Sequence, residues 1–209
     1  MSGSSSGGAL HADIAAVAAR FGHPVDGALI ARLAAFVELL MRWNARINLT
    51  GARTGTELVR DHLPDSFAMS ALVPPAARAI DVGSGGGLPA LPFALLRPDV
   101  ALTLVEPRAK RVAFLRAAVR ELALSAKIVA GRIEAVHDHF DVAGSRATFP
   151  PAEWWPKGET LLAPGGRLLF FLNEAAEAPF PGSAPHQEVR YQAGDKGRVV
   201  MAWVKPGSR

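Results

Sequence analysis

Cysteine is missing from the whole chain of 209 residues. Without thiols there is no disulfide framework, no thiolate metal site and no cysteine nucleophile, so mechanisms that attack a substrate through sulfur are excluded. Histidine offers no replacement metal motif, because His137 and His139 are two positions apart and would lie on different faces of a helix. We therefore expect no metal site.

Long hydrophobic runs are missing as well. No window approaches the ~18 uninterrupted apolar residues of a membrane-spanning helix, and no charged and then apolar leader opens the sequence. We expect a cytoplasmic monomer without membrane contact. Hydrophobic residues make up 49% of the chain, enough for one globular unit. Residues 1–9, rich in serine and glycine, are expected to form a flexible tail.

The excess of positive charge is small but unevenly placed. There are 23 lysines and arginines against 19 acids, a net charge of +4. Such a basic cluster can contact nucleic-acid phosphates, or it can be the solvated face of a helix, and the sequence leaves both readings open. The cluster lies between Glu106 and Glu121 and comprises Arg108, Lys110, Arg111, Arg116 and Arg120.

The segment from Ala79 to Leu88 is the strongest functional signal. An apolar strand passes through Asp81 into a glycine-dense turn, which is typical of a nucleotide-binding loop. A dinucleotide fingerprint needs a sixth-position glycine, where this chain has Leu88. A carboxylate beside the loop disfavours a pyrophosphate and suits a cationic ligand such as S-adenosylmethionine. The candidate cofactor residues here are Asp81, Gly83, Ser84, Gly85, Gly87 and Leu88.

A second acid supports this interpretation. Glu106 ends the apolar run that begins at Ala101, about 20 residues beyond the loop, where a βαβ unit places its ribose-hydroxyl acceptor. We therefore add Glu106 to the candidate cofactor site. The alternative is an ordinary solvated acid at a strand end.

Hydrophobic periodicity predicts two regions, a helical cap over 10–75 and an α/β domain over 76–209. Strands and helices alternate from Arg78 onward, and a hairpin around Gly194 to Gly197 ends the pattern. We expect an α/β fold with a doubly wound, mainly parallel seven-stranded sheet, Rossmann-like, as in class I methyltransferases. The expected helices are 12–20, 28–44, 56–62, 65–73, 88–96, 108–122, 133–139 and 153–162. The expected strands are 78–82, 101–106, 127–130, 141–145, 167–172, 188–192 and 198–205, with a loop at Pro179 to Pro185.

Several ordered blocks resemble one known family, the 16S ribosomal RNA guanine-N7 methyltransferases, also called glucose-inhibited division protein B. The resemblance covers about Phe36 to Phe171, and ordered blocks are more specific than any one of them. The blocks are Leu39 to Asn44, Ile47 to Thr50, Arg60 to His62, Asp65-Ser66, Asp81 to Pro89, Lys110 to Arg116, Gly131 to Glu134 and Ser145 to Ala147.

The resemblance implies S-adenosyl-L-methionine as cofactor and 16S ribosomal RNA or the small ribosomal subunit as partner. Carried over by position, the family's cofactor contacts fall on Gly83, Leu88, Ile133, Glu134 and Arg146. Guanine N7 carries an exposed lone pair, so no catalytic base is assigned and proximity supplies the rate. Candidate substrate-binding residues are Asn44, Asn48, Thr50, His62, Arg132 and Arg146.

Other interpretations of these residues stay open. Asn48 and Thr50 could cap the next segment, His62 and Ile133 could be packing residues, and Arg146 could pair with a structural acid. Where the family has Leu-Lys-Gly after the fifth strand, this chain has Leu172-Asn173-Glu174. This departure keeps two alternatives, a small-molecule methyltransferase and a non-catalytic RNA-binding protein. A nicotinamide dehydrogenase is disfavoured by Leu88.

Overall fold

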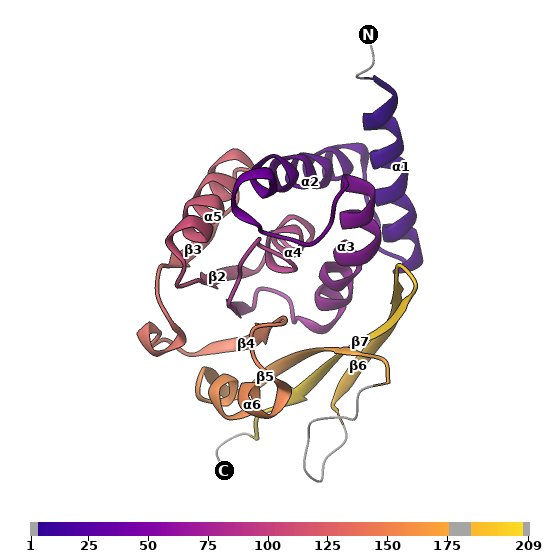
Figure 1. Cartoon of the computed structure of the whole chain (residues 1–209). Helices are drawn as coiled ribbons and strands as arrows, with labels where there is room; N and C mark the ends of the chain where they lie inside the picture. Colours follow the sequence, from indigo (N-terminus) through magenta and orange to yellow (C-terminus); the bar gives the residue numbers. More distant parts are fainter. Residues whose placement is uncertain (1–3, 176–184, 207–209) are drawn as a thin grey trace.

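A single seven-stranded sheet forms the centre of the molecule (Figure 1). The computed structural model describes residues 4–175 and 185–206. The strand order is β3-β2-β1-β4-β5-β7-β6; β7 runs antiparallel to β5 and β6, and the other neighbours are parallel. The predicted fold class is confirmed. The strands are β1 (Arg78–Val82), β2 (Ala101–Val105), β3 (Ala126–Val129), β4 (Phe140–Ser145), β5 (Leu162–Asn173), β6 (Gln187–Ala193) and β7 (Lys196–Val204).

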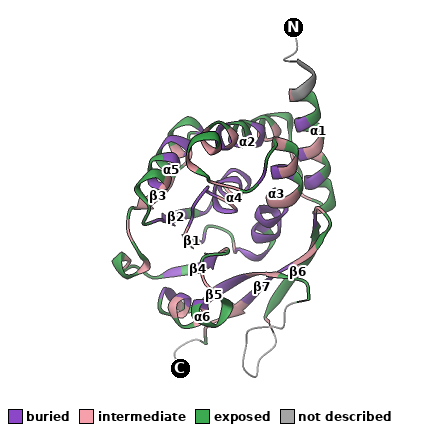
Figure 2. Cartoon of the chain, in the orientation of Figure 1, coloured by how far each residue is buried: buried purple, intermediate pink, exposed green. Residues whose placement is uncertain are grey.

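Helices cover both faces of the sheet, and its central strands are buried (Figure 2). The strand residues alternate between two cores. On β1, Ala79 faces the core shared with the N-terminal helices, whereas Ile80 faces the core around Trp154 of α6. This period of two is that of a sheet buried on both sides. The helices are α1 (Ser4–Arg20), α2 (Gly27–Ile47), α3 (Gly55–Leu72), α4 (Ala90–Leu96), α5 (Ala109–Glu121) and α6 (Pro151–Thr160), with a 3₁₀ turn η1 (Ile133–Ala135).

Helix α2 is amphipathic as predicted, and its ends are set by side-chain chemistry. The Asp26 carboxylate accepts a hydrogen bond of 2.7 Å from the Leu29 N–H and caps the N-terminus. Leu33, Phe36 and Leu40 are buried along one face. Asn48 ends the helix in the left-handed conformation, with φ 50°, which an asparagine tolerates better than most residues.

Helix α3 differs from the prediction, which divided it into two helices at Pro64. One continuous helix passes through the proline. Pro64 has no N–H to bond the Arg60 carbonyl, so that carbonyl would be left without its usual partner. The Gly194 N–H, at the tip of the β6–β7 hairpin, donates to it over 3.2 Å. The hairpin therefore compensates for the proline, which local sequence patterns do not reveal.

Three other boundaries also differ. Helix α1 begins at Ser4, inside the segment expected to be flexible, because Leu10 and Ile14 are buried and anchor the helix. Only the single 3₁₀ turn η1 forms where a helix over 133–139 was predicted. Strand β5 begins at Leu162, earlier than predicted, because Leu162 pairs with Phe140 of β4. The loop predicted at Pro179 to Pro185 lies outside the described residues except for Pro185.

Candidate functional site

The glycine-rich loop lies at the carboxyl end of β1 and is tied to the neighbouring strand. The N–H groups of Gly83 and Ser84 both donate to the Val105 carbonyl, over 2.8 and 3.1 Å. Gly83 has φ 80°, and a Cβ added there would overlap Thr148. Glycine is therefore required at this position by backbone conformation and by space. The loop closes through a 2.7 Å bond from the Gly87 N–H to the Ser84 carbonyl.

Glu106 braces this loop from the end of β2. Its side chain is 2% exposed. One carboxylate oxygen accepts the Gly85 N–H and the other accepts the Arg108 N–H, each over 2.9 Å. The Arg111 guanidinium lies 4.0 Å away. The acid predicted to meet a ribose thus lies beside the loop, where it also fixes the backbone.

Asp81 is a buried group whose neighbours leave one of its hydrogen-bonding atoms without a partner. It is 3% exposed, and among the described residues no donor reaches its Oδ2 atom. Burial raises the pKa of this carboxyl to about 7. A buried acceptor without a donor is unfavourable in the protein alone, so it suits a ligand that brings a cation or an N–H group.

Arg146, directly after β4, is held by two side chains of helix α3. It lies 2.7 Å from His62 Nδ1 and forms an ion pair with the Asp65 carboxylate, which is fully buried. Asp65 also accepts from the Tyr191 hydroxyl over 2.6 Å and from Arg198 over 3.1 Å. The Asp65 cluster, defined as these five residues, thus joins the cap, the end of β4 and the terminal hairpin.

His62 is neutral in this cluster. Burial, followed by the positive charge of Arg146, lowers its pKa to about 4. Because a guanidinium only donates, His62 Nδ1 is the acceptor in their contact. Arg146 pairs with the buried Asp65, as one of the open interpretations expects, and the same residue also lines a cavity.

That cavity has a volume of about 450 Å³ and lies at the carboxyl ends of β4 and β5. Its lining includes Arg146, Phe149, Asn173, Tyr191 and Arg198. Asn173, which departs from the resembling family, pairs in register with Arg198 on β7. The cavity therefore keeps two cations although it lacks the expected lysine.

Sequence reasoning missed Asp65, Tyr191 and Arg198 as parts of this site. Asp65 was noted only within a matching block, and the other two lie in the terminal hairpin. The sequence marks these two residues only weakly: Arg198 precedes the apolar run of β7, and Tyr191 is the only tyrosine of the chain. Their meeting with Asp65 depends on tertiary structure.

The predicted substrate residues of the cap serve mainly their own loop. Asn44 Oδ1 accepts the N–H groups of Leu49 and Thr50 over 2.6 and 2.9 Å, and the Thr50 hydroxyl accepts the Ala52 N–H over 3.2 Å. Asn48 caps α2 and is exposed. This loop packs directly on the glycine-rich loop: the two approach so closely that a Cβ at Gly86 would lie 2.9 Å from the Leu49 carbonyl oxygen.

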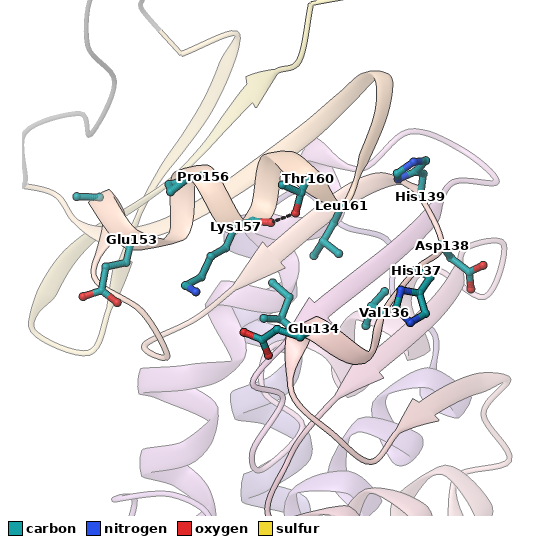
Figure 3. Close-up of a pocket in the computed structure, with 12 residues that line it drawn as sticks. Glu134, Val136, His137, Asp138, His139, Glu153, Pro156, Lys157, Thr160 and Leu161 are labelled. Carbon is teal, nitrogen blue, oxygen red and sulfur yellow. Dashed lines mark hydrogen bonds between the residues drawn. The ribbon is translucent and has the colours of Figure 1, made fainter.

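Ile133 and Glu134 lie apart from Arg146, in a different cavity of about 810 Å³ between η1 and α6 (Figure 3). Lys157 and Thr160 of α6 and the next residue, Leu161, form the opposite wall. Arg132, at the start of η1, is exposed. His137 lines this cavity too, but within the described residues no group of three or more potential ligands is arranged to hold a metal ion.

The fold is that of the class I methyltransferases. The structure is similar to a methyltransferase from Pyrococcus furiosus, with a TM-score of 0.57, 14% identity, and 82% of this chain and 97% of that chain covered. It is also similar to magnesium protoporphyrin IX methyltransferase from Synechocystis PCC 6803, with a TM-score of 0.58, 13% identity, and 87% and 98% covered. At these identities the likeness establishes the fold.

Sequence comparison identifies the family. The family model of rRNA small subunit methyltransferase G matches residues 29–180. The chain is 37% identical over 174 residues to Ribosomal RNA small subunit methyltransferase G of Anaeromyxobacter dehalogenans (strain 2CP-C), with 81% of each covered. It is 43% identical over 137 residues to the protein of that name from Neisseria gonorrhoeae (strain NCCP11945), with 65% and 66% covered. The chain belongs to the rRNA small subunit methyltransferase G family, and the predicted resemblance is confirmed. Within the described residues, no helix has the length and apolar character needed to cross a membrane.

Proposed function

We propose that this protein transfers a methyl group from S-adenosylmethionine to N7 of a guanine in 16S ribosomal RNA. One observation supports the cofactor most directly, the buried Asp81 carboxylate whose Oδ2 has no donor among the described residues. A cationic cofactor at this loop would provide the missing partner, which a pyrophosphate would not. Bound S-adenosylmethionine supplies a methyl group on a sulfonium, whose leaving group is neutral.

The proposed cofactor site follows the carboxyl ends of β1 to β4, where open α/β sheets bind ligands. At Gly83 the loop lets a ligand come close to the backbone, and Glu106 holds the loop in that shape. Ile133 and Glu134 would contact the adenine end, since they follow the third strand. The proposed cofactor residues are Asp81, Gly83, Ser84, Gly85, Gly87, Leu88, Glu106, Ile133, Glu134 and Arg146.

The proposed acceptor site is the cavity of about 450 Å³ lined by Arg146, Phe149 and Asn173. Its aromatic wall suits stacking of a base taken out of its helix, and its cations suit the flanking phosphates. Guanine N7 needs no deprotonation, so orientation replaces a general base. Neutral His62 keeps Arg146 in place at this cavity.

The remaining candidate RNA contacts are Asn48, Thr50 and Arg132, of which Asn48 and Arg132 are exposed. Asn44 supports the same loop through its amide. We propose that the cap over 10–75 contributes to RNA recognition and that residues 76–209 hold the cofactor. In this proposal the protein acts as a cytoplasmic monomer on the small subunit or its RNA.

The test is methylation of small ribosomal subunits purified from cells that lack this protein. Mass spectrometry of the digested RNA should find one new N7-methylguanosine, and calorimetry should detect binding of S-adenosylhomocysteine. Gly83→Asp should abolish both. Binding of the cofactor product without methylation of subunits or naked RNA would favour a small-molecule acceptor. Absence of both activities would favour a non-catalytic RNA-binding protein.

A further inference from the structure

Helices α2 and α5 lie side by side (Figure 1). Near the start of α2, Arg32 donates to the Leu122 carbonyl, directly after α5, over 2.8 Å. Near the end of α2, the Trp43 ring lies 5.7 Å from the Phe114 ring, earlier in α5. The last turns of α2 therefore lie beside the middle of α5, and Arg42 reaches Glu121, the last residue of α5, over 3.5 Å.

These two helix ends border the glycine-rich loop. A Cβ at Gly85 would lie 3.5 Å from Arg111 Nη1, in the first turns of α5. A Cβ at Gly86 would meet Leu40 of α2 and the Leu49 backbone that follows it. The segment from Leu40 to Leu49 and the first turns of α5 thus both border the glycine-rich loop of the proposed cofactor site.

Three cations lie at this border without acidic partners. Arg46, Arg108 and Lys110 are exposed, and no ion pair joins any of them to another described residue. Arg111 differs, because its guanidinium is directed at Glu106, 4.0 Å away. The border therefore presents uncompensated positive charge to solvent next to the loop.

The other two basic residues of α5 lie on a different side of the helix. Lys110 is four residues before Phe114, which faces α2, so the two share a face. Arg116 is two residues after Phe114 and so is directed elsewhere, and Arg120, four residues beyond Arg116, shares its face. The basic cluster is thus divided between a group at the site and a group on the far side.

We propose that Arg46, Arg108 and Lys110 form a phosphate-binding rim that holds the RNA backbone next to the target nucleotide. This proposal rests on the proposed function, because a small acceptor would need no charged border outside the cavity. Exposed cations without an acidic partner break no ion pair when they bind a phosphate, and each phosphate contact releases condensed counterions from the RNA. Arg116 and Arg120 belong to the solvated face and are assigned no RNA contact.

The experiment compares two charge reversals in the full-length protein, the rim variant Arg46→Glu/Lys110→Glu and the control variant Arg116→Glu/Arg120→Glu. Methylation of small subunits is measured across a series of salt concentrations. The rim variant should raise KM at least tenfold. The slope of log KM against log salt concentration should fall by roughly 2, because two phosphate contacts are lost. The control should stay within about twofold of wild type in KM.

Binding of S-adenosylhomocysteine, measured by calorimetry, should be unchanged in both variants. Equal KM values for rim and control would overturn the proposed rim, even with full methylation by the wild type. If the wild type methylates neither subunits nor RNA, the proposed function fails separately. Fluorescence anisotropy with a labelled RNA hairpin then decides on the rim, because selective weakening in the rim variant supports it and equal affinities refute it.

Discussion

Asp65 on helix α3 and Arg146 after strand β4 form an ion pair in which the carboxylate is fully buried. The pair connects the helical cap directly to the proposed site. Two further donors, Tyr191 and Arg198, complete the hydrogen bonding of the carboxylate. A buried charge of this kind is tolerable because its partners compensate for the water it has lost.

Asp65→Asn should lower the free energy of unfolding by about 3 kcal/mol, because it leaves the two guanidinium groups without their anion in a largely buried cluster. Urea denaturation at pH 7 measures the change. The control is Asp61→Asn, which breaks the exposed pair with Arg60 and should have a much smaller effect. Similar losses in both variants would contradict the role given to the buried cluster.

Gly83→Ala should weaken S-adenosylhomocysteine binding at least tenfold, because the new methyl group overlaps Thr148 and the backbone has φ 80°. Calorimetry measures the dissociation constant. Gly165→Ala is the matched control, since Gly165 also has a positive φ, 78°, but has open space around it. Both variants should lose about 1 kcal/mol of stability from backbone strain, yet only the first should lose affinity. Unchanged affinity in Gly83→Ala would rule out the loop as the binding site.

Asp81→Asn should stabilise the protein above pH 7 and have little effect near pH 4. The folded-state pKa of Asp81 is about 7 and its ordinary value is 3.8, so the folded protein holds a proton that the unfolded chain releases between these values. The wild type therefore loses stability as pH rises from 4 to 7, by at most about 1.4 kcal/mol per pH unit, and asparagine does not. Denaturation of both proteins at pH 5, 6, 7 and 8 tests this. A stability difference independent of pH would show that Asp81 titrates normally.

His62→Gln should show the opposite pH dependence. The folded-state pKa of His62 is about 4 against 6.5, so the unfolded chain binds a proton first as pH falls through this range. The stability that neutral His62 gives above pH 6.5 is lost as pH falls toward 4, and glutamine, which can also accept from Arg146, avoids this loss. The difference between wild type and variant, measured at pH 7 and pH 5, should shift in favour of the variant at pH 5. No shift would mean that His62 titrates with the same pKa in the folded and unfolded states.

Much of the fold was predictable because its signals are local. The apolar runs of β1 and β2 and the glycines between β1 and α4 fix those elements within a residue or two. The path of the chain at Pro64 was not predictable, because the group that compensates for the missing N–H is Gly194, far along the sequence. A local rule correctly says that proline disfavours a helix, and only the tertiary contact reverses its outcome.

The candidate site shows the same division. Gly83 and Glu106 follow from the spacing of strand ends, which topology brings to one edge. The role of Asn44 could not be predicted from the sequence, because an amide near the end of a helix can contact RNA or accept from the next turn. The backbone after α2 decides between these roles. Tyr191 and Arg198 were missed because their partner, Asp65, is 126 and 133 residues away.

That separation has a consequence for the order in which the protein is made. A ribosome adding about 5–20 residues per second needs roughly 10 s to pass from Asp65 to Arg198. During this interval the Asp65 carboxylate lacks two of its donors, Tyr191 and Arg198, and leaving a buried charge incompletely compensated is unfavourable. We therefore expect the terminal hairpin to complete the Asp65 cluster last, because a nascent chain without it would hold Arg146 through His62 and Asp65 alone.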